Sequence, residues 1–423
     1  MHNRLRILCF LIVLISINAI LVHVSVAADW FLRYGASITE TWDSNINRTS
    51  TNEMSDFITH LTPNLALTRN TENTKLSLNY AAPLSYYSRY HQYNFPGQNF
   101  SLRWSQNLTK DFKYFFSERY FLSNSAQEKE TSDNVTVIRK SRKSYYIITS
   151  VLGTTYNFTD KDVLSVQYSD SRQQNKDPSI EDSVSYGPSI NLSYWPMEHI
   201  GLNFGYSFNR REYERTAPNY SSNYSSGLTW LVSPHTSTSF SYNIERFHSE
   251  SSNVEDYTTQ SANIGVSHQL GPHLSSSLSL GYYYRNPTRT RSNGGMSYSL
   301  SFKKALEYGS ITITGKGGYT EEYVGPERKG FTKTRGISSA LSYKLSELTN
   351  MSFSVSYFYE NPASENKIYE TWDLAFSLNK TFLKWLSGFS SVSYTKRNVT
   401  GGTDEFQDWT IMIGLSAHGI TKL

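Results

Sequence analysis

The chain has 423 residues, a formal net charge of +4 and a single cysteine; 38% of its residues are hydrophobic and 15% are aromatic. So small a charge, on scattered basic residues, gives no support for nucleic-acid binding. Aliphatic residues are too sparse for a large dry core, whereas the 32 tyrosines suit two aromatic girdles around a barrel. The composition therefore favours a membrane barrel with a polar lumen.

The first 28 residues have the pattern of a secretory signal peptide. A basic start, Met1–Arg6, precedes an almost wholly apolar run, Ile7–Val26, and the small residues Ala27 and Ala28 follow at a plausible cleavage site. We expect cleavage near Ala28, which leaves residues 29–423 as one barrel domain. An uncleaved anchor helix is the alternative, because the apolar run is long.

The mature chain is expected to lack a thiol, because Cys9 lies inside the signal segment. This excludes disulfides, cysteine metal sites, cysteine nucleophiles and covalent haem attachment. After the signal, no apolar run approaches the roughly 20 residues that a membrane helix needs. The chain is therefore either a soluble all-β protein or a protein that crosses the membrane as strands.

Alternation of apolar and polar residues predicts strands along the rest of the chain. In residues 273–286, Leu278, Leu280 and Tyr282 fall on one face, while Ser279 and Gly281 fall on the other. The strands predicted in this way, in chain order, are 30–42, 57–69, 75–87, 100–108, 112–122, 144–158, 163–173, 184–194, 200–212, 220–232, 236–247, 257–269, 273–286, 295–304, 310–319, 336–345, 351–360, 372–380, 387–396 and 405–417.

The connections between these strands alternate in length. Short turns such as Ser233–His235 alternate with longer, more charged loops such as Glu321–Thr334. Short turns at one end and long loops at the other are typical of a transmembrane antiparallel up-and-down β-barrel, with the short turns periplasmic and the long loops extracellular. We predict about 20 strands, with 18 or 16 as alternatives, and both termini on the periplasmic side.

Charged residues within strands are predicted to face the lumen, because a lipid-facing Arg or Lys near the bilayer midplane costs about 2–4 kcal/mol. The candidate lumen-facing residues are Arg103, Glu245, Arg285, Lys316, Lys344 and Asp373. Ser, Asn and Gly predominate on the same face, which suits hydrated solutes such as sugars. The alternative is that any water-filled barrel is lined in this way. Glu118 beside Arg119 breaks the alternation, since one of the two must face outward or lie beyond the hydrocarbon.

No catalytic, cofactor-binding or metal-binding residues are predicted. The ten histidines are dispersed, and none lies in a nucleophile motif. The carboxylate pair Glu321-Glu322 is interpreted as solvated loop charge. No spacing typical of a calcium-binding loop occurs.

One hairpin supports a family resemblance. Residues 57–67, which contain Thr62-Pro63-Asn64-Leu65, and the following residues 75–80 resemble the N-terminal hairpin of outer-membrane β-barrel proteins of Gram-negative bacteria that are often associated with exopolysaccharide or exosortase (PEP-CTERM) systems. The resemblance implies an outer-membrane location and a role in export of an extracellular polysaccharide, and it supplies no catalytic residues. Such barrels usually end on an aromatic residue that assists assembly, whereas this chain ends with residues 419–423, Gly-Ile-Thr-Lys-Leu. The signal for the barrel-assembly machinery would then lie near residues 409–415, or the folding route differs.

The leading hypothesis is a non-enzymatic outer-membrane pore for export of a polysaccharide or passage of sugars. Its expected partners are the lipid bilayer, the barrel-assembly machinery, and a polysaccharide or periplasmic export proteins. One alternative is a structural sleeve around a partner such as an electron-transfer cytochrome, and another is a barrel enzyme that acts on lipid or polysaccharide.

Overall fold

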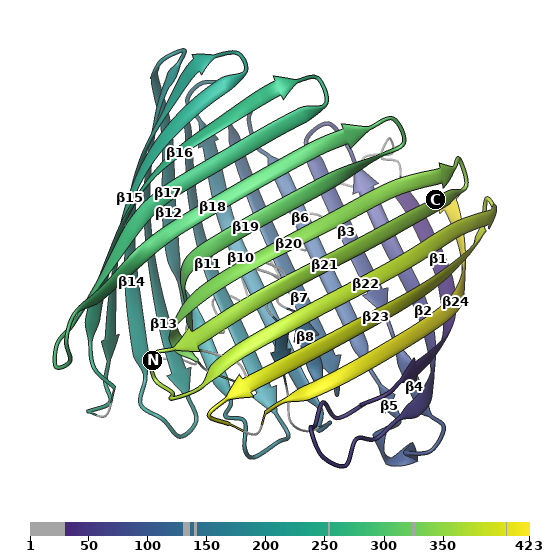
Figure 1. The fold of residues 1–423 in the computed structure, drawn as a ribbon. Coiled ribbons are helices and arrows are strands. Elements are labelled where there is room, and N and C mark those ends of the chain that lie inside the picture. The colour runs from purple at the N-terminus through teal and green to yellow at the C-terminus, as the bar shows by residue number, and fades with distance from the viewer. Residues whose placement is uncertain are drawn as a thin grey trace, which may run out of the picture.

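The computed structural model describes residues 30–129, 136–138, 142–252, 254–323, 327, 329–402 and 404–423. The expected signal peptide, residues 1–28, lies outside the described residues. Within them, a single large sheet is rolled into a barrel (Figure 1). Its strands are β1 (Trp30–Asp43), β2 (Asp56–Asn70), β3 (Thr74–Ala81), β4 (Leu84–Tyr87), β5 (Phe95–Pro96), β6 (Gln98–Asn107), β7 (Phe112–Ser123), β10 (Tyr145–Asn157), β11 (Val163–Asn175), β12 (Ser183–Met197), β13 (Ile200–Tyr213), β14 (Asn219–Ser233), β15 (Thr236–Ser249), β16 (Tyr257–Gly271), β17 (Leu274–Pro287), β18 (Asn293–Leu306), β19 (Gly309–Glu322), β20 (Gly330–Ser346), β21 (Thr349–Pro362), β22 (Ile368–Leu383), β23 (Leu386–Thr400) and β24 (Phe406–Lys422).

The 22 labelled strands of this sheet count as twenty strands of the wall. β3 and β4 lie one after the other beside β2 and count as one strand, and the short β5 leads into β6 and counts with it. Each strand pairs with the next in the chain, and all pairings are antiparallel. β1 pairs with β24 from Phe31–Lys422 to Asp43–Thr410, which closes the barrel (Figure 1). The predicted all-β antiparallel barrel of 20 strands is therefore confirmed.

A pair of short strands and a short helical turn are not part of the barrel sheet. A separate pair of strands, β8 (Gln127–Lys129) and β9 (Thr136–Ile138), lies in the connection between β7 and β10, and a single 3-10 turn spans His91–Tyr93. No helix among the described residues is long and apolar enough to cross a membrane.

The two ends of the barrel differ in their connections. At one end, here called the short-turn end, consecutive strands are joined by as few as two residues, as at Pro234-His235 between β14 and β15. At the other end, called the loop end, the connections are longer, and Asp43 and Asp56 are separated by a 12-residue segment, 44–55. The start of β1 and the end of β24 lie together at the short-turn end.

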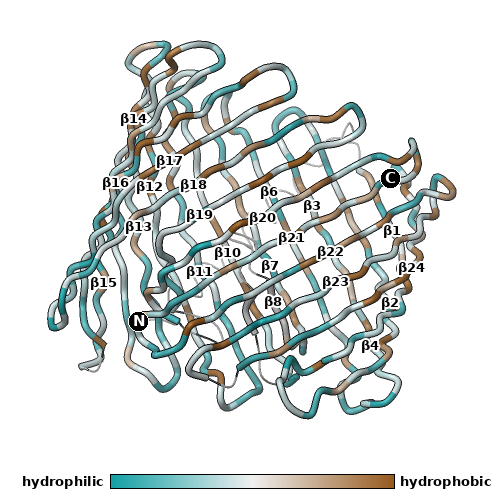
Figure 2. The backbone as a smooth tube through the Cα atoms, in the orientation of Figure 1, coloured by the Kyte–Doolittle hydropathy of each residue, from teal (hydrophilic) through white to brown (hydrophobic). Residues whose placement is uncertain are grey.

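Hydrophobic and hydrophilic residues alternate along many strands of the wall (Figure 2). On β17, Leu280 and Tyr282 are 48% and 56% exposed on the outside, whereas Tyr283 and Arg285 between and beyond them are 2% and 8% exposed. The alternation follows from the pleat, which sends successive side chains to opposite faces. Exposed aliphatic and aromatic side chains on the outer face are the expected covering of a barrel that sits in hydrocarbon.

The two faces of β17 predict opposite responses to the same substitution. We expect Leu280→Arg to lower the free energy of unfolding in phospholipid bilayers by about 2–4 kcal/mol, because it places a guanidinium against lipid. Its neighbour Ser279 pairs with Gly265 and Ser299 on the inner face, so Ser279→Arg should cost clearly less. Urea titration of the bilayer-inserted protein measures both values. Equal losses would show that the two faces are not assigned correctly.

Candidate functional site in the lumen

The six residues predicted to face the lumen lie among small and polar side chains. They lie on six different strands, at positions that alternate with the exposed apolar residues of the wall. Their cross-strand neighbours are Ser77 and Ser117 for Arg103, Asn223 and Thr259 for Glu245, Thr259 and Asn293 for Arg285, Ser299 and Gly336 for Lys316, Asn350 for Lys344, and Ser356 and Thr395 for Asp373.

The end of the β19–β20 hairpin leaves the wall. β17 and β18 pair as far as Arg285–Asn293, but the pairing of β18 with β19 stops at Tyr298–Gly317. The next residue, Gly318, has a φ of 154°, which L side chains rarely adopt, so glycine lets the strand change direction here. We call the described residues between Gly318 and Thr334 the lumen hairpin.

Aromatic rings hold the lumen hairpin against the inner face of the wall. Tyr323 stacks on Phe247 of β15 with the ring centroids 4.5 Å apart, and Tyr319 lies 4.9 Å from Tyr283 of β17. Phe331, which is 3% exposed, contacts Tyr319, Tyr283 and Tyr257. The Tyr213 hydroxyl of β13 also donates a 2.7 Å hydrogen bond to the carbonyl of Tyr323. Since β13 and β19 are six strands apart, the hairpin reaches across the interior.

A row of polar side chains lies under this part of the hairpin. Asn223, Glu245, Thr259 and Arg285 are direct cross-strand neighbours on β14 to β17. The Arg285 guanidinium lies 4.1 Å from the Tyr257 ring centroid and 4.9 Å from that of Phe331. Of the predicted lumen residues, Arg285 is buried and Glu245 is half-buried beneath the hairpin.

Glu321 of the hairpin lies over that row and faces Glu245. Both Glu321 oxygens are buried, and among the described residues no donor reaches them. The prediction that Glu321 is solvated loop charge is therefore wrong. Burial of two neighbouring carboxyl groups disfavours ionisation of both, and the cations near this pair are Arg211 and Arg285.

Ion pairs fasten the opposite side of the hairpin to β21 and β23. Glu327 contacts the Arg397 guanidinium at 2.7 Å, and Lys329 contacts Glu360 at 2.9 Å and Glu327 at 3.1 Å. The Tyr369 ring lies 4.5 Å from the Arg397 guanidinium and 4.9 Å from the Lys329 ammonium. We call Glu327, Lys329, Glu360 and Arg397 the latch. The hairpin thus touches the inner wall on both of its sides and narrows the lumen.

The latch stabilises the charged forms of its hairpin residues. Burial opposes ionisation of Glu327, but Arg397 and Lys329 outweigh it and hold the pKa of Glu327 below its ordinary value of 4.5. Burial also opposes the charge of Lys329, and Glu327 and Glu360 outweigh it and raise the pKa of Lys329 above 10.5. Both residues are therefore charged at neutral pH.

A small polar cavity lies between the hairpin and the inner faces of β21 and β22. Lys316, Thr320, Glu360 and Asp373 are among the residues that line it, and its volume is about 20 Å³, enough for a single water molecule. The structure thus brings the predicted residues Lys316 and Asp373 together, whereas Arg103 on β6 and Lys344 near the short-turn end lie apart from the hairpin.

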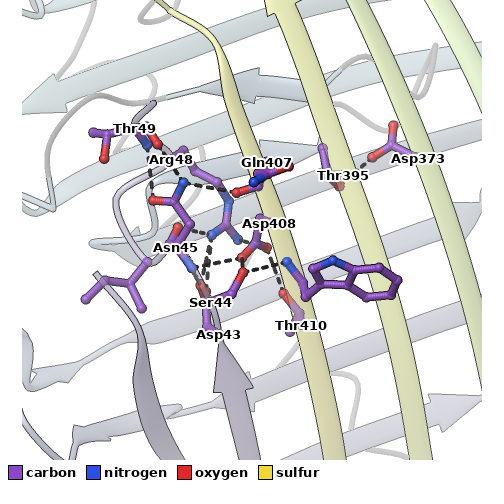
Figure 3. Close-up of polar contacts among 12 residues, drawn as sticks. Asp43, Ser44, Asn45, Arg48, Thr49, Asp373, Thr395, Gln407, Asp408 and Thr410 are labelled. Carbon is purple, nitrogen blue, oxygen red and sulfur yellow. Dashed lines mark hydrogen bonds and ion pairs between the residues drawn. The ribbon is translucent and has the colours of Figure 1, made fainter. Parts of the chain in front are cut away.

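A second inward structure covers the wall near the barrel closure (Figure 3). Arg48, in the connection between β1 and β2, contacts Asp43 of β1 and Asp408 of β24, each at 3.1 Å. The backbone N–H of Asn45 donates to both carboxylates. This network joins the first and last strands at the loop end.

Behind this network, the same connection forms a small apolar core. Ile46, which is fully buried, packs with Ile58 of β2 and Tyr87 of β4. Arg142 donates a 2.8 Å hydrogen bond from Nε to the Ile46 carbonyl, and its guanidinium lies over the Tyr87 ring. The connections between β1 and β2 and between β7 and β10 are thus fixed together at the loop end.

Comparison with solved structures identifies this type of barrel. The siderophore receptor PirA from Pseudomonas aeruginosa matches with a TM-score of 0.54 and 12% sequence identity over 92% of this chain and 80% of that chain. The FrpB iron transporter from Neisseria meningitidis matches at 0.55 and 8% over 92% and 82%, and the copper transporter OprC at 0.58 and 10% over 92% and 80%. The chain has the fold of an outer-membrane β-barrel. No family model and no curated protein sequence matches it.

Among the residues that the structure describes, no group of three or more His, Cys, Asp or Glu side chains is placed to hold a metal ion. Nor do the residues from Trp30 onward that the structure describes include a separate globular domain inside the wall. Among the described residues, the interior of the barrel holds the lumen hairpin and, near the barrel closure, the β1–β2 connection.

Sequence reasoning missed the hairpin residues that make these contacts. Residues 321–334 were predicted to be a solvent-exposed loop, whereas β19 and β20 stay paired as far as Glu322–Gly330. The available signal was the adjacent pair Gly317-Gly318, followed by Tyr319 and Glu321 at positions where the alternation calls for lipid-facing side chains.

Removing a hairpin ring should loosen the hairpin without affecting the barrel. Phe331→Ala removes contacts with three rings, each worth about 0.5–1.5 kcal/mol, so amides of residues 319–323 should lose protection from hydrogen exchange. Phe353→Ala is the matched control, because Phe353 is 38% exposed on the outer face. Equal exchange of the hairpin amides in the two variants would contradict the docking role of the rings.

The latch should also respond to acid. Because the pKa of Glu327 is lower in the folded protein than its ordinary value of 4.5, its stabilisation is present above that pH and is lost as the pH falls through the folded value. We expect hydrogen exchange at residues 329–334, corrected for the intrinsic pH dependence of exchange, to become faster as the pH falls below 4.5, the ordinary pKa of Glu327. In Glu327→Gln the acid step should disappear; its persistence would assign the step to another group.

Proposed function

We propose that the protein is a non-enzymatic outer-membrane pore through which small hydrated solutes, sugars among them, pass beside the lumen hairpin. The observation that carries the proposal is a polar inner wall with a hairpin fixed across it. Barrels of 16 to 18 strands already enclose an aqueous channel, so a wall of 20 strands leaves room beside the hairpin. Hydroxyl and amide groups along the wall can exchange hydrogen bonds with a sugar without trapping it.

The orientation follows from the two ends of the barrel. In this proposal the short-turn end faces the periplasm and the loop end faces the outside, as in outer-membrane barrels generally. The lumen hairpin and the β1–β2 connection then narrow the pore toward its outer mouth. Solutes would meet Glu321, Arg285 and the latch after they enter from outside.

The hairpin also bears on the other candidate functions. A polysaccharide chain in transit, or a partner cytochrome inside the barrel, would have to displace the hairpin and break both the aromatic contacts and the latch. The occupied interior therefore favours a pore for small solutes over a sleeve. The solved structures that share the fold are named as receptors and transporters, which supports transport rather than catalysis. An association with exopolysaccharide or exosortase systems stays a prediction.

Planar-bilayer recordings test the proposal. We expect the refolded protein to conduct, and replacement of residues 320–332 by an Asn-Gly turn to raise the conductance by about twofold or more, because the hairpin no longer fills the lumen. The matched control shortens the β17–β18 connection, residues 288–292, which lies outside the hairpin contacts, and should leave the conductance unchanged.

Two results would contradict the pore. One is the absence of conductance in both the wild type and the hairpin deletion, although each protein is folded and inserted. The other is an equal effect of the two loop replacements. A swelling assay of liposomes with neutral sugars of increasing size then measures the size limit, which the deletion should increase.

A further inference from the structure

A group of charged side chains faces outward from the wall on β7, β10 and β11. Glu118 and Asp170 flank Ser150 in direct cross-strand register, on the face that also carries the exposed Leu152 and Tyr168. Arg172 follows Asp170 by two residues and contacts it at 2.9 Å. We call Glu118, Ser150, Asp170 and Arg172 the outer polar patch.

The outer polar patch lies at a distance from the short-turn end at which the outer face of other strands is apolar. Ser150 is seven positions from Asn157, the short-turn end of β10, and Ser339 is seven positions from Ser346, the short-turn end of β20. Because strands rise by a similar amount per residue, the two serines lie at similar depths. Ser339, however, pairs with Ile313 and Val355 on the outer face.

The charges of the patch are not balanced within one chain. Arg172 pairs with Asp170, while Glu118 accepts a hydrogen bond from the Ser150 hydroxyl and makes no ion pair among the described residues. A carboxylate in contact with hydrocarbon is unfavourable.

We propose that the outer polar patch is a contact surface between two copies of this chain in the membrane. The patch carries both signs of charge, so a two-fold axis through it can place Arg172 of each copy against Glu118 of the other. Each Glu118 then gains a second guanidinium in addition to that of Arg172 in its own chain. The contact also removes Ser150 and Asp170 from lipid. The inference rests on the membrane location of the barrel and not on what passes through its lumen.

Single cysteines test the contact directly, in full-length protein carrying Cys9→Ser. Ser150→Cys should form a disulfide-linked dimer when outer membranes are oxidised, because the two-fold axis brings the two Ser150 positions together. Ser339→Cys replaces the same residue type at a similar depth on β20, outside the outer polar patch, and this variant should stay monomeric. Fractionation of both variants with the outer membrane is measured first, which separates failure of this proposal from failure of the proposed location.

A charge exchange provides a second test that needs no cysteine. Glu118→Arg and Arg172→Glu should each reduce the dimer at least tenfold, as measured by light scattering in mild detergent, and the double variant should restore it. Restoration supports direct pairing between copies. A wild type that is monomeric in detergent and gives no Ser150→Cys dimer in membranes overturns the proposal, as does a patch occupied by lipid or by a different protein.

Discussion

The structure depends on one pairing, that of β1 with β24, which closes the sheet into a barrel. In hydrocarbon each unpaired N–H and C=O group costs several kcal/mol, so a sheet can span the bilayer only when it closes. Closure also fixes which side chains face lipid, because any slip by one residue would turn every side chain of a strand to the other face. The Arg48 ion pairs with Asp43 and Asp408 add a polar fastening at the loop end of this seam.

Inside the wall, the lumen hairpin forms one of two buried clusters, and the other surrounds Ile46. Phe331, Tyr257 and Tyr283 are almost fully buried. On the outer face of neighbouring strands, Leu280 and Ile313 are 48% and 42% exposed. The backbone can leave the β18 ladder after Gly317 because it enters a water-lined interior rather than lipid. Stability of the hairpin and narrowing of the lumen therefore have the same physical origin, the stacking of its rings on the inner wall.

The alternation of side chains could be read from the sequence, and it was sufficient to predict the barrel, its strand number and most strand positions. It could not predict the lumen hairpin. Tyr319, Glu321 and Phe331 continue the same parity as Ile313, which faces outward, yet their side chains pack inside. Parity gives the direction of a side chain only while the strand remains in the wall. Whether a strand leaves the wall depends on contacts such as Tyr323 with Phe247, whose residues are 76 positions apart in the sequence.

Glu118 and Glu321 show how the same sequence signal leads to two structures. Both carboxylates occupy positions whose parity calls for lipid-facing residues. At Glu321 the preceding Gly318 frees the strand from β18, and the carboxylate turns into the lumen. At Glu118 the strand is held on both sides, since β7 pairs without interruption with β6 from Asn107–Lys113 to Gln98–Leu122 and with β10 along its length. The carboxyl group cannot turn inward there and stays on the lipid-facing side beside Ser150 and Arg172. Only a contact from outside the chain can remove it from lipid, so a partner is expected at this face and not at the hairpin.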